Sequence, residues 1–103
     1  MATFRDLLAD ARARITETDP AGAEALLADG HLLLDVREPD EFEQGAIPDS
    51  MHIPRGNLES GIENRVTDRD QPIVVMCAGG VRSAFAADTL AQLGYTDVIS
   101  MDG

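Results

Sequence analysis

The segment IVVMCAGGVRS at positions 73–83 predicts a strand, a tight loop and the start of a helix. Its first four residues are apolar and mostly β-branched, which is typical of a strand buried on both faces of a parallel sheet. From Ser83 to the stop signal at Gly94, small and apolar residues recur at helical spacing, at Ala84, Ala87, Leu90, Ala91 and Leu93. The only cysteine, Cys77, should therefore lie at the carboxyl end of a buried strand.

The loop after Cys77 is suited to hold negative charge. A short glycine-rich loop before a helix turns successive backbone N–H groups inward, at the positive end of the helix dipole. Ala78, Gly79 and Gly80 are small enough for the backbone to close around the sulfur. These donors and the nearby Arg82 should lower the pKa of the thiol below its ordinary ~8.5, so we expect a thiolate at neutral pH. The alternative interpretation is an inert cysteine at the end of a core strand.

A second apolar run, at 32–36, predicts another central strand, with an aspartate inside it. A buried carboxylate must be paired or hydrogen-bonded, so we expect Asp35 to meet Arg37 or Arg82. Residues 38–45 begin with proline and acids and end in glycine, which predicts a short helix whose acidic residues face solvent.

The remaining segments complete an alternating α/β pattern. An amphipathic helix is expected at 1–15, where it would cover the sheet, and a second helix at 21–28 follows the Asp19–Pro20 cap. We further expect a turn with a short strand at 47–54, a weak helix at 55–63, a loop at 67–71 and a last strand at 95–101. The pattern predicts a parallel sheet with helices on both faces, whose ligands bind at the carboxyl ends of strands.

Two motifs resemble those of rhodanese-type sulfurtransferases. Cys-x-x-Gly-x-Arg-Ser at 77–83 resembles the family's active-site loop, and LLLDVREPDEF at 32–42, with GAIP and HIP after it, resembles its first conserved block. The resemblance implies a single rhodanese-like domain over 1–103, with a parallel five-stranded sheet flanked by helices on both faces. The chain departs from the family at Ala46, where histidine is common, and after Gly103, where the family's C-terminal helix is absent, so we expect a fragment of a longer protein.

The resemblance also implies a sulfur transfer by double displacement. Cys77 would take a sulfane sulfur from thiosulfate or a persulfide and pass it to a thiol, cyanide or a protein acceptor. The substrate-binding residues would be Ala78, Gly79, Gly80, Val81 and Arg82, supported by Asp35, Arg37 and Ser83. Arg82 would either orient an anionic donor or hold the loop through Asp35. Many family members have a basic residue near Ala78, so we expect weak use of thiosulfate and more use of a persulfide.

Three other functions stay open. Cysteine phosphatases and arsenate reductases also place backbone donors between a cysteine and an arginine, but their loop is one residue longer than the four residues between Cys77 and Arg82. His52 could act as a base for Cys77 in a thiol hydrolase, although we expect it to be satisfied locally. A non-catalytic rhodanese-like interaction or regulatory module would keep the fold without the reaction.

The amino-acid composition limits which binding partners and which cellular locations are expected. The 103 residues include 19 acids against 8 bases, all of them arginine, for a net charge of -11. This charge repels nucleic acid and favours a basic sulfur-relay protein as partner. The lack of lysine fits a GC-rich genome, which we favour, or a high-salt cytoplasm. One cysteine and two histidines give no disulfide or zinc-ligand set, and no segment resembles a signal peptide or a membrane span. We therefore expect no cofactor, no metal, no membrane and a cytoplasmic location.

Overall fold

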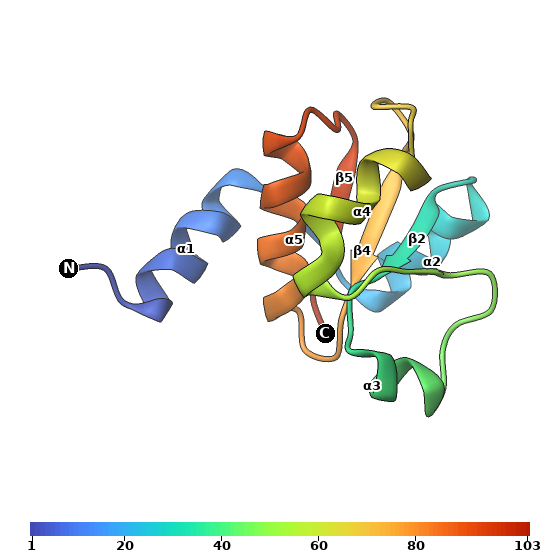
Figure 1. The fold of residues 1–103 in the computed structure, drawn as a ribbon, viewed down its shortest axis with the longest axis horizontal. Helices are drawn as coiled ribbons and strands as arrows, with labels where there is room; N and C mark the ends of the chain where they lie inside the picture. Colours follow the sequence, from blue (N-terminus) through green and yellow to red (C-terminus); the bar gives the residue numbers. More distant parts are fainter.

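The computed structural model describes residues 1–103 and contains one five-stranded sheet in which all paired strands are parallel (Figure 1). Its strands, in the order β1-β5-β4-β2-β3, are β1 (Thr16–Thr18), β2 (Leu32–Asp35), β3 (Met51–His52), β4 (Ile73–Met76) and β5 (Val98–Met101). The two apolar runs β2 and β4 are neighbours, with Asp35 opposite Met76. The predicted parallel α/β sheet is confirmed, and Arg37 and Cys77 follow the carboxyl ends of adjacent strands.

Helices cover both faces of this sheet. They are α1 (Phe4–Arg14), α2 (Pro20–Ala28), α3 (Pro39–Glu43), α4 (Leu58–Arg65) and α5 (Val81–Gln92), with a 3-10 turn, η1 (Arg55–Asn57). Residues of α4 and α5 form the larger core on one face, whereas α2 closes the smaller core on the other. None of these helices combines the length and the apolar character needed to cross a membrane.

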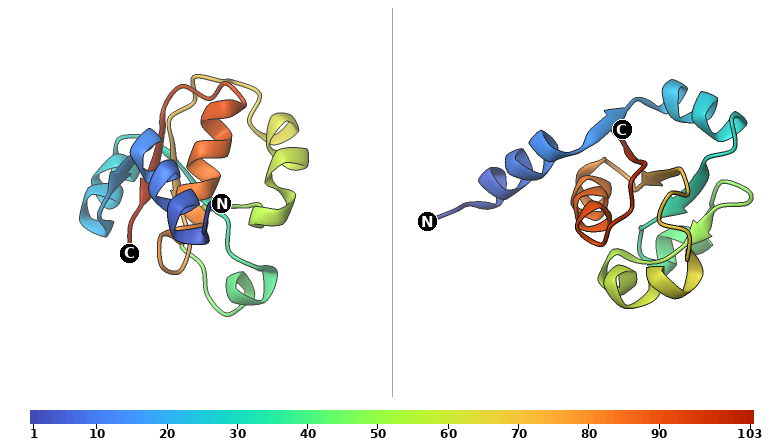
Figure 2. Two further views of the ribbon diagram at one scale, coloured as in Figure 1. Left: turned by 90° about the vertical axis from the view of Figure 1, so that its left-hand side faces the viewer. Right: turned by 90° about the horizontal axis from the view of Figure 1, so that it is seen from above.

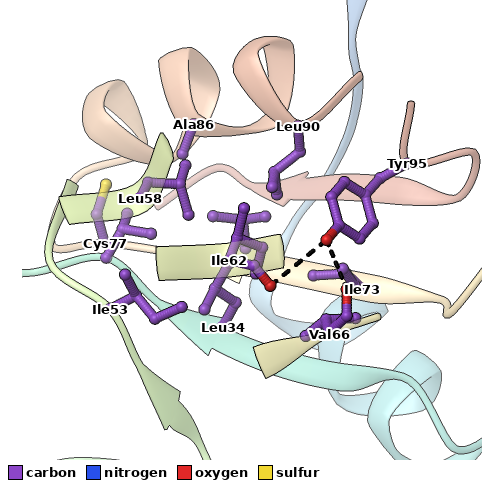
Figure 3. Close-up of a cluster of buried hydrophobic side chains, with 12 residues drawn as sticks. Leu34, Ile53, Leu58, Ile62, Val66, Ile73, Cys77, Ala86, Leu90 and Tyr95 are labelled. Carbon is purple, nitrogen blue, oxygen red and sulfur yellow. Dashed lines mark hydrogen bonds between the residues drawn. The ribbon is translucent and has the colours of Figure 1, made fainter. Parts of the chain in front are cut away.

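The alternation of side chains along β4 places Cys77 on the larger core. Ile73 and Val75 point to that core, as Cys77 does, whereas Val74 and Met76 point to the smaller one. Figure 3 shows Cys77 at one end of the larger core and Tyr95 at the other, where the Tyr95 hydroxyl donates to the Val66 carbonyl oxygen at 2.5 Å. The sulfur therefore extends from a packed, aliphatic interior.

Helix α1 forms as its pattern predicts, but the expectation that it covers the sheet is wrong. It packs against α5, with the ring centroids of Phe4 and Phe85 6.1 Å apart, and it projects from the body of the molecule (Figures 1 and 2). Ala11 is its one buried residue, and the side chains of Phe4 and Leu7 remain 63% and 53% exposed. The helix lies outside the sheet because residues 16–18, for which the sequence predicts no strand, form the edge strand β1 beside β5.

Candidate active site

The loop between β4 and α5 encloses the sulfur of Cys77. The backbone N–H groups of Gly80 and Ser83 donate to Sγ at 3.0 and 3.3 Å, and the Ser83 hydroxyl lies 3.5 Å from it. Cys77 is only 3% exposed, whereas Ala78 and Gly79 next to it are exposed to solvent. A reactant can therefore approach the loop on the side of these two residues.

Some of the predicted loop donors do not reach the sulfur. No hydrogen bond joins the N–H groups of Ala78, Val81 or Arg82 to Sγ. Helix α5 begins at Val81, two residues before the expected start, so that Val81, Arg82 and Ser83 all lie in its first turn, and of these three only the N–H of Ser83 donates to Sγ. Ser83, predicted as a supporting residue, instead contributes both a backbone and a side-chain contact.

Gly80 is the position at which this loop needs glycine. Its φ of +90° lies in the left-handed region, and a Cβ there would be 2.8 Å from Asp102 Oδ1 and 3.3 Å from the Gly103 nitrogen. Gly79, by contrast, has open space around the corresponding position. The segment that follows β5 therefore lies directly against the sulfur loop.

Two opposing effects act on the pKa of the Cys77 thiol. Burial raises the pKa, whereas the Ser83 hydroxyl and the backbone N–H groups of Ser83, Gly79 and Gly80 lower it by stabilising the thiolate. The net result is a pKa below the ordinary value for a thiol, in the direction that the glycine-rich loop predicts.

Strand β5 contributes a second hydroxyl to this site. The Ser100 hydroxyl lies 3.0 Å from that of Ser83, and both residues are fully buried. The Ser83 hydroxyl can donate its single proton either to Cys77 or to the Met101 carbonyl oxygen, 3.3 Å away. Ser100 is not among the site residues predicted from the sequence, although a lone hydroxyl in an otherwise apolar strand is a signal for it.

Asp35 pairs with the first of its two predicted partners. Its fully buried carboxylate accepts hydrogen bonds from the backbone N–H of Arg37 at 3.0 Å and from the guanidinium of the same residue at 2.8 to 3.1 Å. Arg37 also donates to the Gly45 carbonyl oxygen at 2.8 Å. This pair therefore fixes the chain between β2 and α3, and the Arg37 guanidinium is already occupied.

Arg82 does not pair with Asp35, which corrects one of the sequence expectations. Its two terminal nitrogens bind the two carboxylate oxygens of Glu41 on α3, at 2.6 and 3.0 Å. This contact lowers the pKa of Glu41 to about 2, with help from the backbone N–H of Glu38. The expectation that the acids of α3 simply face solvent is wrong for Glu41, because α3 lies beside the first turn of α5.

The ring of His52 is engaged in local contacts and not in a contact with Cys77. Its Nε2 donates to the Arg37 carbonyl oxygen at 2.8 Å, and its ring stacks on Phe42 with the centroids 4.2 Å apart. The local satisfaction that we expected for His52 is thus present, and the geometry does not support a thiol hydrolase.

Comparison with known proteins identifies the family. The family model for the rhodanese-like domain matches residues 19–103. The chain is 43% identical over 84 residues to the thiosulfate sulfurtransferase GlpE of Pseudomonas syringae pv. syringae. The aligned region covers 82% of this chain and 77% of the relative.

Solved structures agree with this match. A protein of unknown function from Rhodopseudomonas palustris, RPA3614, described as a candidate tyrosine phosphatase, has a TM-score of 0.90 and 32% identity, over 100% of this chain and 86% of that one. The human single-domain sulfurtransferase TSTD1 has a TM-score of 0.73 and 27% identity, over 84% of this chain and 88% of that one. The chain belongs to the rhodanese-like domain family, as a sulfurtransferase.

Proposed function

We propose that this protein moves a sulfane sulfur from a donor to an acceptor by way of a persulfide on Cys77. The observation that carries the proposal is the contact of Sγ with the N–H groups of Gly80 and Ser83, at 3.0 and 3.3 Å. Fixed donors around a sulfur stabilise its anion, both as the attacking thiolate and as the terminal sulfur of a persulfide. Ser83 adds a hydroxyl that can donate to the same anion.

The first displacement forms the persulfide. The Cys77 thiolate attacks the outer sulfur of thiosulfate, a new S–S bond forms, and the old S–S bond breaks with its electron pair on sulfite. With a persulfide R–S–SH as donor, the leaving group is the thiolate R–S⁻ and the outer sulfur keeps its proton. No net oxidation or reduction is required in either case.

The second displacement returns the enzyme to its starting state. A thiolate or cyanide attacks the outer sulfur of the Cys77 persulfide, and the electron pair of the S–S bond returns to the cysteine sulfur. The products are a new persulfide or thiocyanate. Cys77 is the nucleophile, and the loop from Ala78 to Arg82 surrounds the transferred sulfur, with Gly80 and Ser83 as the hydrogen-bond donors. Asp35 and Arg37 hold the neighbouring turn in place.

Thiosulfate and persulfides are both proposed as donors. The name of the Pseudomonas relative supports thiosulfate, whereas Ala78 and the net charge of -11 favour a low-molecular-weight or protein persulfide. The acceptor could equally be a small thiol, cyanide or a basic sulfur-relay protein. Cys77 is a free thiol with no second cysteine to pair with, which fits a compartment that keeps thiols reduced, so we propose the cytoplasm as the location of the reaction.

A phosphatase reaction is less well supported by the geometry. The loop has four residues between Cys77 and Arg82, and both terminal nitrogens of Arg82 are bound to Glu41. The guanidinium is therefore not free to clamp a tetrahedral oxyanion, as a phosphatase reaction requires.

Intact-mass spectrometry after incubation with thiosulfate, cysteine persulfide or glutathione persulfide tests this proposal. We expect a mass increase of one sulfur atom in the wild type, which disappears when cyanide is added and is absent from Cys77→Ser. If no donor modifies the wild type, the interaction-module interpretation replaces the proposal. Hydrolysis of p-nitrophenyl phosphate that depends on Cys77, without any sulfur adduct, would instead favour the phosphatase.

A further inference from the structure

We propose that Glu41 determines donor specificity: it neutralises Arg82, so that the site selects sulfur donors of low negative charge over dianions such as thiosulfate. This inference rests on the proposed sulfur transfer at Cys77. It assigns to one residue of α3 a role that the sequence motifs do not indicate.

The Arg82–Glu41 pair lies at the surface of the site. The contacts of 2.6 and 3.0 Å join both ends of the guanidinium to both oxygens of the carboxylate. The side chains are 33% and 32% exposed, so that the pair is open to an entering donor. The negative charge of Cys77 also acts on Arg82 and favours its charged form.

The other charges around the sulfur do not offset this neutralisation. Arg37, on the adjacent strand end, is bound to Asp35 and to the Gly45 carbonyl oxygen. Glu38 adds a further negative charge that acts on Arg82. Since Ala78 supplies no cation, and Arg37 and Arg82 are each bound to a carboxylate, neither of these two arginines is free to bind a dianion that approaches the Cys77 thiolate. A persulfide carries at most one negative charge near its outer sulfur and therefore experiences less of this repulsion.

The pair stays charged throughout the working range of pH. With the pKa of Glu41 at about 2, its carboxylate is ionised at every pH at which the thiolate forms. The preference among donors should therefore come from a fixed charge, not from a titration.

Replacing Glu41 by glutamine removes the charge and keeps the local structure. The other contact of Glu41 Oε1 is with the backbone N–H of Glu38, at 3.0 Å, in the capping box of α3. A glutamine side-chain oxygen can accept the same bond. The variant thus leaves the helix cap in place and frees the positive charge of Arg82.

The experiment compares kcat/KM for thiosulfate with kcat/KM for cysteine persulfide in the wild type and in Glu41→Gln. We expect the ratio of the two values to rise roughly tenfold in favour of thiosulfate, mainly through a lower KM, and the gain to shrink at high salt. Glu41→Asp, which keeps the charge, should keep the wild-type ratio. The matched control is Glu63→Gln, which breaks a similar pair with Arg69, 2.7 Å apart, away from the site.

The outcomes separate this inference from the proposed function. If the Cys77 adduct forms in all variants but the donor ratio of Glu41→Gln equals that of Glu63→Gln, the role of Glu41 is overturned and sulfur transfer is not. If the wild type forms no adduct, the proposed function itself fails. Should Glu41→Gln not fold, the wild type decides: a thiosulfate rate that rises with salt supports repulsion, and a constant or falling rate contradicts it.

Discussion

Ser83 is the residue whose side chain most directly supports the anionic sulfur. Its hydroxyl accepts a hydrogen bond from the Ser100 hydroxyl and can donate a hydrogen bond to Cys77 Sγ. Replacing this hydroxyl leaves the backbone donors of the loop unchanged. The stabilisation that this one side chain gives to the thiolate can therefore be measured separately from that of the backbone.

We expect Ser83→Ala to raise the pKa of Cys77. A hydrogen bond to a charged group contributes about 1.5–3 kcal/mol, and 1.36 kcal/mol corresponds to one pKa unit, so the shift should be roughly one unit or more. The rate of alkylation by iodoacetamide, followed against pH, measures it, with Ser60→Ala on α4 as control. Identical midpoints in Ser83→Ala and the wild type would show that the hydroxyl donates to Met101 instead.

The same pKa couples the stability of the protein to pH. Because folding lowers the pKa of Cys77, the thiolate stabilises the native state fully above the unfolded pKa of ~8.5. That contribution is lost as the pH falls through the lower, folded pKa. Two measurements should therefore give the same pH window. One is the alkylation rate of Cys77 in the wild type, and the other is the difference in unfolding free energy between the wild type and Cys77→Ser.

At the scale of elements, α5 and α1 should differ sharply in what they contribute to stability. Leu90 on α5 is fully buried in the larger core, whereas Leu7 on α1 is 53% exposed. We expect Leu90→Ala to lower the free energy of unfolding by about 2–5 kcal/mol, and Leu7→Ala to change it by no more than about 0.5 kcal/mol. Urea denaturation measures both variants. A large loss for Leu7→Ala would mean that α1 covers apolar surface after all.

The elements that the sequence predicts well are those whose own residues carry the signal. β2 and β4 are apolar runs because they are buried between two layers of helices, and this burial is visible in four consecutive residues. β1 reads Thr-Glu-Thr, is largely exposed and lies at the sheet edge, so only its pairing with β5 makes it a strand. No local pattern could have indicated it.

The same distinction holds for the site. The sulfur loop is contiguous, so Cys77, Gly80 and Ser83 could be identified together. Glu41 is 41 residues from Arg82 in sequence, and folding alone brings the two together. Asp35 and Arg37 were predictable as a pair because they are two residues apart at the end of a strand.

For the whole molecule, charge is the dominant feature of the surface. Six of the 19 acidic residues pair with arginine, and the others have no arginine partner to offset their repulsion. Only the Asp35 and Asp88 carboxylates are largely shielded from water, and the other four pairs are open to solvent on both sides, where such pairs contribute about 0–1 kcal/mol each. Screening by salt should therefore weaken the repulsion among the acidic residues more than it weakens the attraction within the arginine pairs.

We expect the unfolding temperature to rise as sodium chloride increases from low to moderate concentration. Each kcal/mol of stabilisation corresponds to a rise of about 4–8 °C for a chain of this size. Thermal unfolding followed by circular dichroism provides the measurement, with sucrose at matched osmolality as the control for solvent exclusion. A falling midpoint would show that the arginine pairs, and not the unpaired acids, dominate the electrostatics.

The position of β5 has a consequence for the time at which the protein becomes reactive. This strand is the last of the five to be synthesised, yet it lies between β1 and β4, and Thr16 pairs with Ile99. Until the ribosome has released residues 98–101, β1 has no partner and the Ser100 hydroxyl cannot reach Ser83. A nascent chain that has not yet exposed β5 therefore lacks the Ser100–Ser83 contact, and the complete hydrogen-bond network around the sulfur can form only after β5 has paired with its two neighbours.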